Sequence, residues 1–272
     1  MNYFDDPRLN QSSLKEFDKC PYLYKAKHLD KIVPAEDSDA LTFGSAVDCY
    51  LTEGKDEFDQ QYEAVARRSK HREDDAPIQL TMSAYDKVMT AIERVKSQPV
   101  MVMFDWMDTQ TILTTDKYKA KLDYFGVRNN IGYIADLKTT ANYDRFIRTI
   151  DDWGYYTQMS FYRMMAKRAH RNIKRFKCYF IVVDKSDNNK FGVFEISQSR
   201  LDKEEVELKK LIRRFNHTVR VNSFRPTKNK DTCRACQFYS LCDHAGCTKK
   251  DIIKIGETEN YYDQDKTKFV EL

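Results

Sequence analysis

The sequence predicts a mixed α/β fold, and two patterns carry this prediction. Three consecutive segments alternate apolar and polar residues with the period of β-strands, and a second pair of such segments follows later in the chain. Long segments with helical periodicity lie before, between and after them. Because strands and helices are interleaved irregularly, we expect a mixed sheet flanked by helices and not a regular doubly wound sheet.

The first part of the chain is expected to be mainly helical. The segment Ser13 to Glu16 has the pattern of a capping box, which opens a short helix toward Cys20. A second helix is expected over residues 41–53. A third, strongly amphipathic helix is expected over residues 83–98, and Pro99 ends it.

The strands are expected in the second part of the chain. They cover residues 111–115, 117–126, 131–138, 176–183 and 191–196. Asn129-Asn130 suits a two-residue hairpin turn, because Asn tolerates a positive φ angle. Further long helices are expected over residues 155–170 and 200–221.

The composition places the chain among soluble proteins with a packed core, since 41% of its residues are hydrophobic and 32% are charged. It contains no apolar run long enough to span a bilayer and no cationic-then-apolar start, so we expect a cytoplasmic protein without a membrane partner. The net charge of +4 excludes a wholesale polycation, so a basic groove for nucleic acid has to be local. The absence of a GxxxxGK[ST] loop argues against a nucleotide-driven motor.

Two acidic residues and a lysine are expected to meet on the hairpin. With Asn129-Asn130 as the turn, Asp123 and Asp136 lie directly opposite each other, and such residues share a face with Cβ atoms about 4.5–5.5 Å apart. Lys138, two residues beyond Asp136, shares that face. Two carboxylates this close need a neutralising cation, and their hard oxygen atoms suit Mg²⁺ or Mn²⁺. Such a metal can polarise a phosphodiester and activate water, while the lysine orients that water or stabilises charge on the phosphate.

A surface hairpin with a cross-strand salt bridge is the simpler interpretation of the same residues. The neighbouring apolar residues favour central strands, where charges are rarely placed without a function. These neighbours are Leu122, Tyr124, Ile134 and Leu137. Both interpretations stay open on these residues alone.

In its motifs the chain resembles the PD-(D/E)XK nuclease superfamily, and specifically the RecB-like branch. Asp123 matches the first acidic residue of the family, and Asp136-Leu137-Lys138 matches the (D/E)XK triplet. Gln158 and Tyr162 match the Q-x-x-x-Y motif of the next helix, where residues four apart share one face.

The segment Phe43 to Asp48 resembles the G-x-x-x-H helix of the same branch, with Asp48 standing in place of the usual metal-binding His. An aspartate can still bind a hard cation. The resemblance implies a restriction-endonuclease-like mixed sheet within one nuclease domain over residues 1–272. The metal ligands that it implies are Asp48, Asp123, Asp136 and the Leu137 carbonyl, and the catalytic residues are Asp123, Asp136, Lys138, Gln158 and Tyr162.

The seven cysteines are distributed in a way that indicates a metal and not disulfides. Four of them lie within fifteen residues, namely Cys233, Cys236, Cys242 and Cys247, while Cys20 stands near the start of the chain. Thiolates select zinc or iron–sulfur clusters. The four clustered cysteines, with His244 nearby, also permit a self-contained zinc knuckle, so the spacing does not decide between the two metals.

Iron–sulfur nucleases of the RecB-like branch, such as AddB-type subunits and the CRISPR Cas exonuclease, have one cysteine before the nuclease core and a C-x₂-C-x₅-C motif after it. The segments 12–21 and 233–242 resemble these two parts. The resemblance therefore implies a [4Fe-4S] cluster held by Cys20, Cys233, Cys236 and Cys242, with Zn²⁺ as the alternative. Such a cluster would join residues 12–30 and 225–247 into one lobe, followed by a polar tail of unassigned role over residues 248–272.

The function implied by the resemblance is that of a Mg²⁺- or Mn²⁺-dependent DNA exonuclease in recombination, repair or phage DNA processing. Its expected partners are single- or double-stranded DNA ends and a recombination or single-strand annealing protein. Two other functions fit parts of the sequence. The Asp48 departure favours a non-catalytic DNA-binding or assembly factor that keeps the fold and cluster, and the cysteines alone are compatible with a zinc-ribbon nucleic-acid-binding protein.

Overall fold

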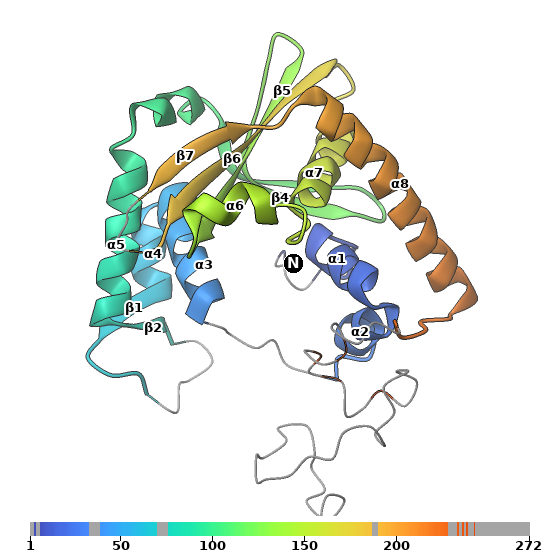
Figure 1. Ribbon diagram of the computed structural model, residues 1–272, viewed down its shortest axis with the longest axis horizontal. Helices are drawn as coiled ribbons and strands as arrows, with labels where there is room; N and C mark the ends of the chain where they lie inside the picture. The colour runs from blue at the N-terminus through green and yellow to red at the C-terminus, as the bar shows by residue number, and fades with distance from the viewer. Residues whose placement is uncertain are drawn as a thin grey trace, which may run out of the picture. The chain divides into compact units, whose positions relative to one another are not determined.

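A five-stranded sheet organises the larger of the two compact units into which the chain divides (Figure 1). The computed structural model describes residues 3, 6–32, 39–69, 76–186 and 190–227, together with the single residues 233, 236, 238 and 242. The larger unit comprises residues 1–11 and 37–210, and the smaller unit comprises residues 12–36 and 211–272. Both segments of the predicted cluster lobe belong to the smaller unit.

The sheet has the strand order β3-β4-β5-β6-β7. These strands are β3 (Asp108–Thr114), β4 (Lys119–Arg128), β5 (Ile131–Thr140), β6 (Arg175–Asp184) and β7 (Phe191–Glu195). All neighbours are antiparallel except β5 and β6, which are parallel and therefore need a crossover. The crossover contains the helices α6 (Tyr143–Thr149) and α7 (Tyr155–Ala169). The mixed α/β prediction is confirmed, and the arrangement is consistent with a restriction-endonuclease-like fold.

Asn129 and Asn130 connect β4 to β5 with φ angles of 54° and 59°. Two positive φ angles in succession define a type I′ turn, whose twist matches the twist of the flanking strands. The turn fixes the register, which pairs Arg128 with Ile131 and continues to Tyr124 and Ala135. A slip of one residue would move every side chain to the opposite face, so this turn decides which residues meet at the site.

Helices cover both faces of the sheet, as Figure 1 shows. On one face, the apolar residues of α3 (Asp39–Thr52) and α5 (Met82–Lys96) pack with Leu137, Tyr179, Ile181 and Val183 in one core cluster. On the other face, Phe180 of β6 contacts the rings of Phe146, Tyr155 and Tyr156. This explains why β6 is apolar along most of its length instead of alternating.

Several short elements were not expected from the sequence. The helix α4 (Lys55–Gln61) follows α3, and β1 (Tyr62–Val65) pairs in parallel with β2 (Ile78–Thr81) in a separate two-stranded sheet. A 3₁₀ helix, η2 (Pro99–Phe104), follows α5. The long helices and the five strands of the main sheet match the expected segments to within a few residues.

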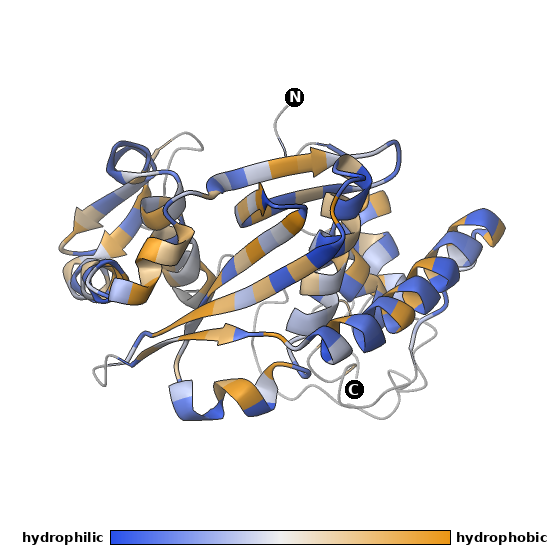
Figure 2. Cartoon of the chain, turned by 90° about the horizontal axis from the view of Figure 1, so that it is seen from above, coloured by the Kyte–Doolittle hydropathy of each residue, from blue (hydrophilic) through white to orange (hydrophobic). Residues whose placement is uncertain are grey.

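The smaller unit contains most of α1 (Gln11–Lys19), then α2 (Pro21–Tyr24), the π-helix η1 (Lys25–Leu29) and the last turns of α8 (Gln198–Val221). Figure 2 shows α8 as a mostly hydrophilic helix with hydrophobic residues at intervals. Those residues serve packing, since Phe215 lies 5.1 Å from Phe17 and 5.2 Å from Tyr24 between ring centroids. In the described part of the chain, each helix is too short or too polar to cross a bilayer.

Candidate active site

The hairpin of β4 and β5 brings the predicted acidic residues together in the larger unit. The last regular pair of the ladder is Tyr124 and Ala135, which places Asp123 and Asp136 at the next position on each strand. At this position a side chain accepts the hydrogen bond of a strand N–H: Asp123 Oδ2 accepts from the Leu137 N–H over 2.8 Å. Asp123 is thereby fixed beside the Asp136-Leu137-Lys138 triplet.

Asp136 is almost completely buried and contacts two donors. Its Oδ1 accepts a hydrogen bond of 2.9 Å from Gln158 Nε2. Its Oδ2 lies 2.5 Å from Lys138 Nζ in a buried ion pair. Lys138 Nζ in turn lies 4.8 Å from the ring centroid of Tyr155.

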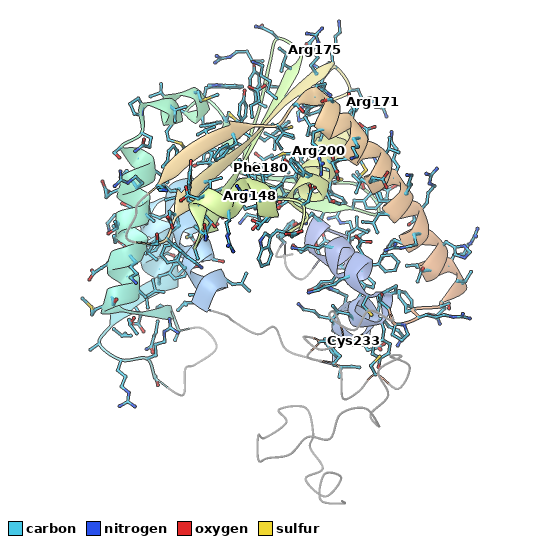
Figure 3. All side chains as sticks on the ribbon, in the orientation of Figure 1. Arg148, Arg171, Arg175, Phe180, Arg200 and Cys233 are labelled. Atoms are coloured by element: carbon cyan, nitrogen blue, oxygen red, sulfur yellow. The ribbon has the colours of Figure 1, made fainter. Side chains whose placement is uncertain are left out.

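Helix α7 supplies Gln158 and Tyr162 one turn apart, as predicted. The Gln158 Nε2 donates both to Asp136 and, over 2.8 Å, to Tyr162 Oη. The start of this helix is held in place by Phe180, whose ring centroid lies 6.0 Å from that of Tyr155 (Figure 3). The parallel register places Phe180 opposite Asp136, so β6 lies beside the strand of Asp136 and also contacts the start of the helix that carries Gln158.

Asp48 projects from α3 toward the same cluster. Its Oδ2 accepts a hydrogen bond of 3.0 Å from Gln110 Nε2, and its Oδ1 is buried without a hydrogen-bond partner. Gly44, one turn earlier on α3, explains how this helix approaches β5. A Cβ atom at Gly44 would lie only 3.2 Å from Thr139 Oγ1, so the glycine allows the close approach.

Burial is the largest cause of the raised pKa of each of the three carboxylates, and neighbouring carboxylate charges add to it at Asp48 and Asp123. Burial, with the charges of Asp48 and Asp136, raises the pKa of Asp123 well above its usual range. Burial also raises the pKa of Asp136, against the opposing effect of Lys138, and raises the pKa of Asp48 to about 6. Burial alone would lower the pKa of Lys138, but the carboxylates of Asp136 and Asp123 outweigh it and the pKa is raised. Lys138 therefore stays an ammonium ion beside these acids.

The comparisons with known proteins agree with this geometry. The family described as "PDDEXK-like domain of unknown function (DUF3799)" matches residues 10–240, which is most of the chain. The chain belongs to this PDDEXK-like family. No curated protein is similar enough to match it.

A solved structure supports the fold of this PDDEXK-like chain. The "Putative exonuclease" of Eubacterium rectale superposes with a TM-score of 0.60 at 17% sequence identity, covering 86% of this chain and 88% of that one. At this identity the likeness shows the fold alone. The structure of SSO0001 covers 86% of this chain and 96% of its own at 11% identity, but its TM-score of 0.33 is too low to carry an argument.

The residues of the PDDEXK-like site suit a hard divalent cation. Three carboxylates and one ammonium leave a formal excess of two negative charges in a buried place, which a divalent ion balances. Asp48 Oδ1 is a buried oxygen without a hydrogen bond, as expected of a group with a ligand still to bind. Across the described residues, however, no three His, Cys, Asp or Glu side chains form a group that could hold a metal by itself. The fit of the site to a divalent cation therefore rests on its charge and on the type of donor atom. The role of the Leu137 carbonyl as a metal ligand stays a prediction.

The four cysteines of the predicted cluster all lie in the smaller unit. The Thr227 N–H donates to Cys20 Sγ over 3.3 Å, and Cys233 Sγ donates to the Thr227 carbonyl over 3.4 Å, so both thiols flank one residue. Burial raises the pKa of Cys236, and the charges of Cys20 and Cys242 raise it further. Figure 3 labels Cys233 in this region. Metal binding by these thiols stays a prediction, and Cys247, His244 and the tail 248–272 lie outside the described residues.

Three residues of the site were missed in the sequence. Tyr155 carried a usable signal, because it precedes Gln158 by three residues and therefore shares its helix face. Thr52 follows Asp48 by four residues on α3, so its hydrogen bond to the Asp48 carbonyl is local to that helix. Gln110 carried no signal, since its contacts with Asp48 and Thr52 depend on the packing of α3 against the sheet.

Proposed function

We propose that this PDDEXK-like protein is a metal-dependent deoxyribonuclease that hydrolyses phosphodiester bonds with Mg²⁺ or Mn²⁺, and that it acts from DNA ends in preference to internal sites. The observation that carries the proposal is the buried contact of Asp136 with both Lys138 and Gln158, next to Asp123. A surface salt bridge, the simpler interpretation of these residues, would not bury Asp136 to 1% exposure. The end preference is supported by the motif resemblance and by the name of the E. rectale relative.

The metal would be held by Asp48, Asp123, Asp136 and the Leu137 carbonyl. When bound, it would polarise the scissile phosphate and lower the pKa of the attacking water. The hydrolysis forms one P–O bond from water and breaks one P–O ester bond, leaving a phosphate and a hydroxyl.

Within this site, Lys138 can stabilise the developing negative charge. Its ammonium is protonated and its side chain is only 15% exposed. The contacts with Asp136 and with the Tyr155 ring restrict its position before substrate binds. Gln158 has a different task. By donating to Asp136 Oδ1, it orients this carboxylate so that the other oxygen faces Lys138 and the metal position.

We further propose that Cys20, Cys233, Cys236 and Cys242 hold a [4Fe-4S] cluster, with Zn²⁺ as the alternative. The contacts of Cys20 and Cys233 with the same residue, Thr227, and the effect of Cys20 and Cys242 on the pKa of Cys236 support the proposal. Thiolate ligands fit both metals, so metal analysis has to decide. Recombination, repair or phage DNA processing, together with an annealing partner protein, remains the setting that the resemblance implies.

The alternative function is a non-catalytic DNA-binding or assembly factor. The aspartate at position 48 favours it, because the RecB-like branch has a histidine there. The burial of Asp48 beside the other carboxylates argues against it, because a buried charge without a function costs stability.

The test is a nuclease assay on end-labelled linear DNA and on circular DNA, in single- and double-stranded form, with Mg²⁺ or Mn²⁺. Wild type is compared with Asp136→Asn and with the control Asp86→Asn, whose side chain lies on the exposed face of α5. We expect degradation of linear DNA by the wild type and the control, and none by Asp136→Asn or in EDTA. Equal activity of wild type and Asp136→Asn overturns the proposal, and cleavage of circular DNA overturns the end preference.

A further inference from the structure

Gln110 of β3 has a backbone conformation that is rare for its residue type. Its φ angle is 49°, in the left-handed region that favours glycine. The strand pairs on either side are regular, with Thr109 opposite Tyr124 and Thr111 opposite Leu122. Gln110 therefore lies at the position opposite Asp123, and a strained residue inside an otherwise regular strand beside a site calls for a specific cause.

The side chain of Gln110 supplies that cause. Its Nε2 donates to Asp48 Oδ2 over 3.0 Å and also to Thr52 Oγ1. The hydroxyl of Thr52 donates to the Asp48 carbonyl oxygen over 2.7 Å. The Gln110 amide donates to both other residues, and the Thr52 hydroxyl accepts from Gln110 and donates to Asp48. These hydrogen bonds connect the strand β3 to the last turn of α3.

This set of contacts leaves one oxygen of Asp48 for another ligand. Oδ2 is occupied by the Gln110 amide, whereas Oδ1 is buried and has no hydrogen-bond partner. The contact with Gln110 thus holds one oxygen of this carboxylate and leaves the other without a hydrogen bond. Substitution of a partner that orients a metal ligand typically weakens metal binding by about 10–100-fold.

We propose that Gln110 is a positioning residue that fixes Asp48 as a one-oxygen ligand of the divalent cation, with Thr52 fixing Gln110 in turn. The inference rests on the proposed metal site and goes beyond it, because neither Gln110 nor Thr52 belongs to the motifs that the chain shares with nucleases. The backbone strain at Gln110 is then the cost of directing its amide at Asp48.

The competing explanation is purely structural. In it, Gln110 only supplies a hydrogen bond to the buried Asp48 carboxylate and does not change the affinity of the site for a metal ion. Substitution by glycine separates the two. Glycine adopts a φ of 49° without strain, so Gln110→Gly should not lower the melting temperature of the metal-free protein by more than the lost hydrogen bond, while it removes the amide from Asp48. Gln110→Asn also tolerates this backbone conformation but has a side chain one methylene shorter.

The experiment is calorimetric titration of Mn²⁺ into the full-length, chelator-stripped protein, with melting curves of the same samples. We expect Gln110→Gly and Gln110→Asn to bind Mn²⁺ about tenfold or more weakly than wild type. Thr52→Ser, which keeps the hydroxyl, should bind like wild type, and Thr52→Val should show part of the loss. In an Asp48→Ala background, Gln110→Gly should cause no further loss, because the ligand that it positions is absent.

Two results would overturn the inference, and they are distinguishable. If wild type binds Mn²⁺ and both Gln110 variants bind it within twofold of wild type, Gln110 has a structural role only and the metal site stands. If wild type itself binds no Mn²⁺, the metal site and the proposed function fail together with the inference.

Discussion

The substitution Asp123→Asn should stabilise the metal-free protein while it abolishes nuclease activity. Asparagine has the same shape as aspartate, and its amide oxygen can still accept the 2.8 Å hydrogen bond from the Leu137 N–H. What changes is the charge, since one of three mutually repelling carboxylates becomes neutral. A substitution that removes function and adds stability is the expected signature of an electrostatically strained site.

The size of the effect follows from Coulomb's law. Two unit charges about 5 Å apart repel by roughly 3 kcal/mol at an effective dielectric constant of about 20. Lys138 and partial protonation reduce this, so we expect a net gain of about 1–2 kcal/mol at pH 8. For a chain of this length, that corresponds to a rise of about 2–4 °C in melting temperature.

The effect should depend on pH in a defined direction. The pKa values of Asp48, Asp123 and Asp136 are raised in the folded state, that of Asp48 to about 6. Groups with raised pKa favour the folded state fully below their unfolded pKa of about 4, and this contribution is lost as the pH rises through their folded pKa values. The difference in melting temperature between Asp123→Asn and wild type should therefore be small at pH 5 and large at pH 8.

The assay is thermal unfolding in EDTA at pH 5 and pH 8, followed by circular dichroism. It is repeated with Mg²⁺ at about 100 times the dissociation constant measured for wild type. Mg²⁺ should stabilise wild type by up to roughly 2.7 kcal/mol at that saturation and the variant much less. If Asp123→Asn melts below wild type at pH 8 in EDTA, the carboxylates do not repel one another in the folded protein and the electrostatic reasoning is refuted.

Three further predictions concern the other groups of the two sites. Gln158→Met keeps the side-chain volume and removes the amide, so it should lower kcat about 10–100-fold with a much smaller change in KM. The control Gln61→Met on α4 should leave both unchanged. An unchanged kcat for Gln158→Met contradicts the positioning role of Gln158. Asp48→His introduces a nitrogen ligand, so the ratio of Mn²⁺- to Mg²⁺-supported rates should rise several-fold, and an unchanged ratio means that Asp48 is not a ligand. Cys233→Ser should lose the iron and the brown colour of anaerobically purified protein. The control Cys178→Ser, in the buried strand β6, should keep both. Zinc in a colourless wild-type protein decides for Zn²⁺, and the absence of both metals contradicts a metal site at these cysteines.

The parts of the fold that were predictable are those whose pattern is local. The hairpin of β4 and β5 combines alternating burial with an Asn-Asn turn that needs two positive φ angles, and both features are visible in the sequence. The placement of Asp123 beside Asp136 follows from that turn alone. Similarly, Gln158 and Tyr162 share a face because of helical geometry, whatever the tertiary structure.

The parts that were missed depend on packing between distant segments. The helix α6 has only seven residues and is held through Phe146, whose partners Tyr155 and Phe180 come from two other elements. The strands β1 and β2 have four residues each and pair across an intervening segment, so neither is long enough to show a period. The left-handed conformation of Gln110 is invisible in the sequence, because glutamine gives no signal for it.

The central claim is that the carboxylates of the hairpin bind the metal ion that enables DNA cleavage. The most direct measurement is a Mn²⁺ titration in which binding and the rate of cleavage of linear DNA are followed on the same preparation, for wild type and Asp136→Asn. We predict that binding and cleavage of the wild type reach half-saturation at the same Mn²⁺ concentration, and that Asp136→Asn loses both. Cleavage that persists in Asp136→Asn, or that saturates at a Mn²⁺ concentration unrelated to binding, would contradict the account.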